Sequence, residues 1–306
     1  MNQREETGTL LSCRPAIKVL DATLRDGGLV NDFRFSDDFV RALFAANAAA
    51  GTDYMELGYK ADADLFDAEK FGKWKFCRED DVFRVLGENK TDMKLACMAD
   101  VGRCNFMRDI CEKGASPFDM YRIATYINTI PAAVEMIEYC EKMGYETTVN
   151  IMAVSRETEK ELSIALDMLG RSPVRAIYIV DSYGSVYPEE MRVLAAKYLE
   201  AGAKYGKEIG IHAHNNQNGM GRGAGNCALE LLLAFLKNPK YKLLHILRFL
   251  EAGHMQALRD AGAVWGYDLP YLLTGVYNRH PSSAIRYIRD GRKDIVTFMQ
   301  ELLDQE

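Results

Sequence analysis

Strand-like and helix-like patterns alternate along most of this 306-residue chain, and this alternation constrains its fold more than any other feature. Several of the strand-like runs are apolar almost throughout, as parallel strands buried on both faces are. The runs begin roughly 26–41 residues apart, near residues 17, 53, 94, 120, 146, 176 and 208. The spacing predicts an α/β fold, a TIM-type (β/α) barrel whose chemistry lies at the carboxyl ends of the strands.

The residues at the ends of the helical patterns agree with this interpretation. Ser36 is a suitable N-cap for a helix over residues 37–50, which Gly51 ends. Other helices are predicted over 131–143, 158–169 and 188–205, each followed by a glycine. The first strand is predicted over residues 17–24, and the glycine pair at 27–28 predicts a sharp turn after it.

The alternation stops after seven strands. An eighth strand should begin about 30 residues after residue 208, but residues 217–226 form a Gly-rich segment. A parallel crossover needs about a dozen residues, which are not present there. We therefore predict a barrel that lacks one βα unit, open beside its first and seventh strands. Residues 1–15 are predicted to be an N-terminal tail, 16–236 the barrel and 237–306 a helical C-terminal region.

The composition excludes several classes of protein. At 48% hydrophobic and 27% charged residues the chain is ordinary for a globular protein, and its net charge of −6 argues against a nucleic-acid binder. No run reaches the roughly 18 apolar residues that cross a membrane, and the N-terminus lacks a signal-peptide pattern. The seven cysteines include no C-x-x-C pair, which favours a reducing cytoplasm over a disulfide framework.

Polar side chains of several chemical types gather where the predicted strands end. Alternate residues of a strand point to the same side, so the imidazoles of a His-x-His pair can converge on one metal ion. By itself such a pair is more often packed and hydrogen-bonded without metal, and an adjacent Arg-Asp is more often a surface ion pair. The candidate residues are Arg25, Asp26, Glu56, Tyr59, His212 and His214.

Four motifs follow predicted strands in a fixed order: D-A-T-L-R-D-G at 21–27, D-S-Y-G at 181–184, H-A-H-N at 212–215 and the Gly-rich 219–226. Together they resemble the DRE-TIM metallolyase superfamily, also called pyruvate carboxyltransferase or HMGL-like, over about residues 16–236. Residues 266–281 are similar to the helical region of its 4-hydroxy-2-oxovalerate aldolase branch. We place the chain nearest to that branch.

The resemblance implies a divalent-metal site whose ligands are Asp26, His212, His214 and Asn226. Mn²⁺ or Mg²⁺ suits this donor set best, with Zn²⁺ as the alternative. It also implies a small 2-oxo acid as substrate, a 4-hydroxy-2-oxo acid that yields pyruvate and an aldehyde. Arg25 would then neutralise the charge of the enolate that forms beside the metal.

Two further roles stay open in the sequence. Glu56 either holds Arg25 by a charge-assisted hydrogen bond or is a buried structural carboxylate, and Tyr59 is either a proton donor or an aromatic residue at the rim. Leu29 stands where the aldolase branch has a catalytic histidine, so the acid–base residue is not identified. We expect His280, like the other isolated histidines, to be a surface or structural residue.

Three functions remain to be distinguished. The first is the metal-dependent lyase or aldolase, the second is a Claisen-type synthase that joins an acyl-CoA to a 2-oxo acid, and the third is an inactive, truncated barrel. Pyruvate release without CoA separates the first from the second, and bound metal separates both from the third. The helical C-terminal region is expected to support a homo-oligomer. The aldolase branch also has a dehydrogenase partner, which nothing in these residues indicates here.

Overall fold

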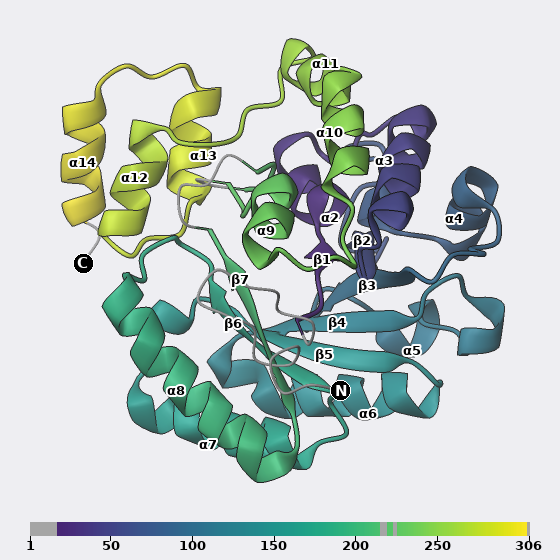
Figure 1. The fold of residues 1–306 in the computed structure, drawn as a ribbon. Helices are drawn as coiled ribbons and strands as arrows, with labels where there is room; N and C mark the ends of the chain where they lie inside the picture. The colour runs from purple at the N-terminus through teal and green to yellow at the C-terminus, as the bar shows by residue number, and fades with distance from the viewer. Residues whose placement is uncertain (1–16, 215–218, 223–224, 305–306) are drawn as a thin grey trace. The chain divides into compact units, whose positions relative to one another are not determined.

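The computed structural model describes residues 17–214, 219–222 and 225–304. Within these residues, seven strands form one sheet in the order β1-β2-β3-β4-β5-β6-β7 (Figure 1). The β1–β2, β2–β3, β5–β6 and β6–β7 pairs are parallel. The strands are Leu20–Asp21 (β1), Tyr54–Tyr59 (β2), Lys94–Asp100 (β3), Met120–Thr125 (β4), Glu146–Ile151 (β5), Ala176–Asp181 (β6) and Glu208–Ala213 (β7). The predicted α/β class and the count of seven strands are confirmed.

The chain divides into two compact units, each of which is described separately. The first unit consists of residues 1–98, 111–120 and 228–264, and the second of residues 99–110, 121–227 and 265–306. The predicted boundaries of tail, barrel and C-terminal region remain predictions. The predicted tail, like residues 215–218, lies outside the described part of the chain.

In the first unit, α3 packs against α10. The Ser36 hydroxyl accepts a hydrogen bond from the Phe39 backbone N–H at 3.2 Å, and Gly51 ends α3 at φ 78°, both as predicted. A core of side chains including Val19, Leu236 and Ile246 joins these helices to the start of β1. The helices are Thr23–Gly27 (α2), Asp37–Ala50 (α3), Glu79–Leu86 (α4), Leu229–Leu236 (α9), Leu243–Glu251 (α10) and His254–Asp260 (α11).

The segment after β1 differs from the prediction. A strand through residue 24 and a glycine turn were expected, but α2 begins at Thr23 because the Asp21 carboxylate accepts hydrogen bonds from the Thr23 backbone N–H (3.3 Å) and hydroxyl (2.8 Å). Gly28 has an ordinary helical φ of −58°. It is required for space, since a Cβ there would lie 2.2 Å from Cδ1 of Phe33. The motif residues Arg25 and Asp26 therefore lie on a short helix.

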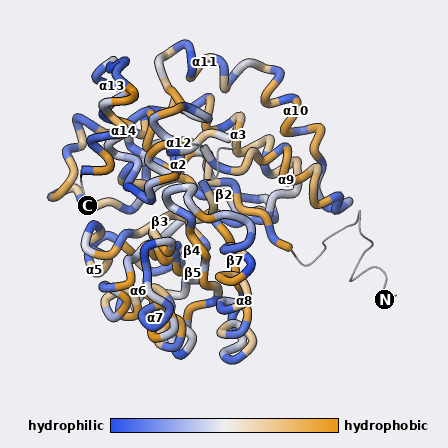
Figure 2. Tube along the Cα trace, turned by 90° about the vertical axis from the view of Figure 1, so that its left-hand side faces the viewer, coloured by the Kyte–Doolittle hydropathy of each residue, from blue (hydrophilic) through white to orange (hydrophobic). Residues whose placement is uncertain are grey.

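In the second unit, α6 contacts β5, α8 contacts β6 and β7, and α12 packs against α13 and α14 (Figure 1). Hydrophobic and hydrophilic colours alternate along α6 and α7 in Figure 2, as expected of helices that bury one face. No helix in the described ranges has the length and apolar character needed to cross a membrane. The helices are Phe106–Asp109 (α5), Ile130–Lys142 (α6), Glu159–Arg171 (α7), Pro188–Tyr205 (α8), Leu269–Val276 (α12), Ser282–Arg289 (α13) and Ile295–Leu303 (α14).

Candidate metal centre

Arg25, Asp26 and Glu56 form a buried ion-pair network. Arg25 donates a hydrogen bond from Nη1 to Oδ1 of Asp26 at 2.6 Å and another from Nε to Oε2 of Glu56 at 2.7 Å. The three side chains are at most 3% exposed. The interpretation of Arg25 and Asp26 as a surface ion pair is therefore wrong, and Glu56 makes the charge-assisted bond that was one of its two predicted roles.

The network keeps Arg25 charged. Burial by itself would lower the pKa of Arg25, but the carboxylates of Glu56 and Asp26 outweigh burial and hold that pKa well above its ordinary value. A buried ion pair is costly to form and still more costly to break. The guanidinium is consequently a fixed cation beside the Asp26 carboxylate.

Tyr59, at the end of β2, is buried at 7% exposure and is not an exposed rim residue. Its ring centroid lies 5.9 Å from Cζ of Arg25 and 4.5 Å from Nζ of Lys75. Phe33 meets the same ring edge-on at 5.6 Å. The sequence did not single out Lys75, a buried lysine whose ammonium contacts aromatic rings on separate segments.

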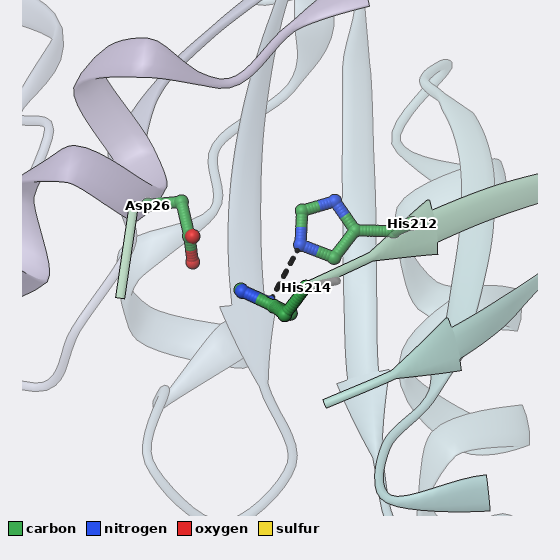
Figure 3. Close-up of side chains that lie close together, drawn as sticks. All are labelled: Asp26, His212 and His214. Carbon is green, nitrogen blue, oxygen red and sulfur yellow. Dashed lines mark hydrogen bonds between the residues drawn. The ribbon is translucent and has the colours of Figure 1, made fainter. Parts of the chain in front are cut away.

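The two motif histidines lie at the end of β7 and turn toward each other. Their Nε2 atoms are 3.1 Å apart, and the dashed line in Figure 3 marks this contact. Nδ1 of His214 lies 3.0 Å from the carbonyl oxygen of Arg222. When Nδ1–H donates to that carbonyl, the neutral ring has its lone pair on Nε2, the arrangement typical of a histidine that ligates metal. His214 is 3% exposed and His212 is half-buried.

Asp26, His212 and His214 each offer one ligand atom, and these atoms all lie within 4.8 Å of one another (Figure 3). One carboxylate oxygen and two imidazole nitrogens are ligands that divalent cations accept in proteins. Three protein ligands leave coordination positions for substrate and water. The donor set thus fits a divalent cation.

Asn226 closes the Gly-rich loop through its backbone. Its N–H and C=O pair with the C=O and N–H of Gly219, each at 3.1 Å, in an isolated antiparallel bridge. The predicted role of the Asn226 side chain as a ligand stays a prediction. Asn215, Asn216, Gly223 and Ala224 lie outside the described residues.

The D-S-Y-G motif has a structural task at the end of β6. The two carboxylate oxygens of Asp181 accept hydrogen bonds from the backbone N–H groups of Ser185 (3.0 Å) and Val186 (3.2 Å). The Ser182 hydroxyl accepts one from the backbone N–H of Ala153 at 2.9 Å. These bonds fix the turn that leads to α8 and place Tyr183 beside His280. Nothing in the sequence predicts this contact, because the two residues lie far apart along the chain.

Comparison with known protein families finds a match to the HMGL-like family over residues 16–218. Two curated relatives cover most of the chain. An oxaloacetate decarboxylase of Mycobacterium tuberculosis is 24% identical over 89% of this chain and 85% of its own length. A 4-hydroxy-2-oxovalerate aldolase of Pelotomaculum thermopropionicum is 23% identical over 86% of this chain and 84% of its own length.

Two solved structures have a similar fold. The N-terminal domain of a putative aldolase from Bacteroides vulgatus matches with a TM-score of 0.73 and 25% identity, over 89% of this chain and 96% of that one. The HMG-CoA lyase from Brucella melitensis matches with a TM-score of 0.58 and 12% identity, over 80% of this chain and 99% of that one. The second match concerns the fold alone.

Proposed function

Because the chain belongs to the HMGL-like family, we propose that it is a divalent-metal-dependent lyase that breaks a carbon–carbon bond of a small 2-oxo acid. The match to this family confirms the resemblance that the sequence motifs indicated, at the level of the family. The names of both curated relatives describe the breaking of a carbon–carbon bond in a 2-oxo acid, which supports this reaction class. The specific substrate that we propose is a 4-hydroxy-2-oxo acid, which yields pyruvate and an aldehyde.

One observation carries the proposal, namely the ligand atoms of Asp26, His212 and His214 within 4.8 Å of one another. These three side chains would hold the metal, with Asn226 as a candidate fourth ligand. When bound, the metal supplies Lewis-acid polarisation of the substrate's keto oxygen. The two imidazoles contribute as neutral ligands and the Asp26 carboxylate brings one negative charge.

Arg25 would stabilise the charge that develops during cleavage. As the bond between C3 and C4 breaks, the proton of the 4-hydroxyl leaves, the bonding electrons move toward the keto oxygen, and C3 later gains a proton. The fixed guanidinium lowers the energy of the resulting negative charge. Glu56 positions Arg25, and Tyr59, beside Arg25, is the candidate for the proton transfer.

The test is release of pyruvate from 4-hydroxy-2-oxovalerate in the presence of Mn²⁺ and the absence of CoA, measured with a coupled dehydrogenase assay. Asp26→Asn should lower kcat/KM by more than about 100-fold, because the anionic ligand is lost. Asp38→Asn is the matched control, since Asp38 is 95% exposed on α3. Full activity of Asp26→Asn would show that the metal role is assigned wrongly. A strict need for an acyl-CoA would instead favour the synthase.

A further inference from the structure

The turn after α12 is anchored to the ends of two strands. Asn278 accepts hydrogen bonds at Oδ1 from the hydroxyls of Ser155 (2.8 Å) and Ser185 (3.2 Å), and its Nδ2 donates to the Ser155 carbonyl (3.1 Å). Ser155 follows β5 and Ser185 follows β6, at separations of 123 and 93 residues from Asn278. The position of His280, two residues after this anchor, is therefore built into the second unit.

Hydrogen bonding fixes the tautomer of His280. Its Nδ1 accepts a hydrogen bond from the backbone N–H of Ser282 at 3.1 Å, so the neutral ring carries its proton on Nε2. The ring meets Tyr183 edge-on, with centroids 5.9 Å apart and planes at 77°. Tyr183 itself is 9% exposed. His280 thus presents an N–H donor while it is uncharged.

Two arginine side chains carry positive charge near this donor. Burial, and then the charges of Arg222 and Arg103, lower the pKa of His280 to about 4. Burial raises the pKa of Tyr183, while a hydrogen bond from Arg156 and the charge of Arg222 oppose that rise. Arg103, Arg156 and Arg222 come from the loops after β3, β5 and β7. Arginines from three loops therefore act electrostatically on the adjacent side chains of His280 and Tyr183.

We propose that Arg222, His280 and Tyr183 form a binding site for a second acidic group of the substrate, remote from its 2-oxo acid end. Guanidinium, imidazole N–H and phenol all donate hydrogen bonds, and anionic oxygens are the acceptors that match them. The Arg222 carbonyl lies 3.0 Å from Nδ1 of His214, so the backbone that carries this guanidinium is beside a proposed metal ligand. Next to His280, the buried Nε of Arg279 has no hydrogen-bond partner within the described residues, and an acceptor is what it requires.

An anion site at this position restricts the class of substrate. It favours 2-oxo acids that end in a carboxylate or a phosphate over 2-oxo acids with an uncharged end. That the bound anion is part of a substrate depends on the function proposed above, whereas the existence of the anion site does not. The two can therefore be tested independently.

The experiment follows the His280 resonance by NMR in metal-free protein with labelled histidine, as a function of pH, with inorganic phosphate or with malonate. Five histidines are present, and His280→Gln assigns the signal. An anion bound beside the ring should raise the pKa of His280 by at least about one unit. A larger response to malonate indicates a carboxylate ligand, and a larger response to phosphate indicates a phosphate ligand.

Two arginine variants and a control test the assignment. Arg222→Gln should weaken the binding of the effective anion at least tenfold, and Arg103→Gln, at an exposed arginine, should weaken it less. Arg289→Gln, 73% exposed on α13, should bind as the unmodified protein does. If neither anion shifts the His280 titration, or if Arg222→Gln responds fully, the proposed site is wrong.

Steady-state kinetics separates this result from the proposed function. Arg222→Gln should raise KM at least tenfold more for 4-hydroxy-2-oxoglutarate, whose far end is a carboxylate, than for 4-hydroxy-2-oxovalerate, whose far end is a methyl group. If no 2-oxo acid yields pyruvate but His280 responds to the anions, the lyase function fails and the anion site stands. If pyruvate forms but the kinetic difference and the NMR response are both missing, the anion site fails and the lyase function stands.

Discussion

Glu56 determines where the guanidinium of Arg25 lies. Its carboxylate accepts a 2.7 Å hydrogen bond from Nε of Arg25, while Asp26 accepts a second one from Nη1. The Glu56 side chain is fully buried, so bulk solvent does not compete for this hydrogen bond. At the scale of single residues, the proposed chemistry depends as much on such a positioning residue as on the groups that would touch substrate.

Glu56→Gln tests that dependence. The variant keeps the shape of the side chain but removes the negative charge that Glu56 places beside Arg25. We expect the free energy of unfolding to fall by about 3 kcal/mol, because breaking a buried charge pair leaves desolvation uncompensated. Urea denaturation measures this change, and Glu69→Gln, at an exposed position, is the control. An unchanged urea midpoint would contradict the buried network.

The lowered pKa of His280 predicts how the stability of the protein depends on pH. Its pKa is about 4 in the folded protein and about 6.5 when unfolded, so the unfolded chain takes up a proton first as the pH falls. The resulting loss of stability sets in below about pH 6.5 and is complete by about pH 4. Since the ring is only half-buried, we expect a loss on the order of 2 kcal/mol. His280→Gln should remove this part of the acid sensitivity in urea titrations at pH 7 and pH 4.5. If the stability of His280→Gln depends on pH as that of the unmodified protein does, this role of His280 is wrong.

Elements with clear end signals were predictable from the sequence. α3 and α8 have the predicted bounds, because N-cap, proline and glycine residues mark their ends. β1 was overestimated since the Asp21 side chain starts α2 directly after it. α4 and α5 were missed because they are short and carry few buried apolar residues. Local sequence determines such elements only where caps or periodicity are present.

The residues of the candidate site were predictable from the sequence, but the contacts that they make were not. The motifs supplied Asp26, His212 and His214, because the resemblance to a family carried them. Nothing local indicates that the carbonyl of Arg222 lies beside His214 or that His280 meets Tyr183. Contacts between residues far apart in the sequence are determined by the whole fold rather than by the residues on either side.

The short helix α2 depends on close packing at Gly28. A Cβ at this position would lie 2.2 Å from the Phe33 ring, although its backbone conformation suits any residue. Gly28→Ala should therefore destabilise the protein by about 2 kcal/mol and weaken metal binding, because α2 carries Asp26. Gly114→Ala, where no atom lies within 4 Å of the added Cβ, is the control. Thermal unfolding and Mn²⁺ titration measure both effects, and a neutral result at Gly28 would contradict the packing argument.

At the scale of the molecule, the sheet formed by the described residues has seven strands, and β7 is the last of them. β2 is buried at every residue, whereas β7 has no fully buried residue and exposes 58% of Ile211. β7 therefore has the exposure of an edge strand, and His212 lies on it. A barrel that lacks one βα unit is functional only if this strand still presents its imidazoles as a metal requires.

Binding of Mn²⁺ to the purified protein, followed by electron paramagnetic resonance, tests the metal centre most directly. We expect one Mn²⁺ to bind per chain, with an affinity reduced at least about 100-fold in Asp26→Asn and in His214→Ala. Asp38→Asn should bind as the unmodified chain does, because its side chain lies in solvent. Absence of binding, or equal affinity in Asp26→Asn and the unmodified protein, would contradict the proposed centre.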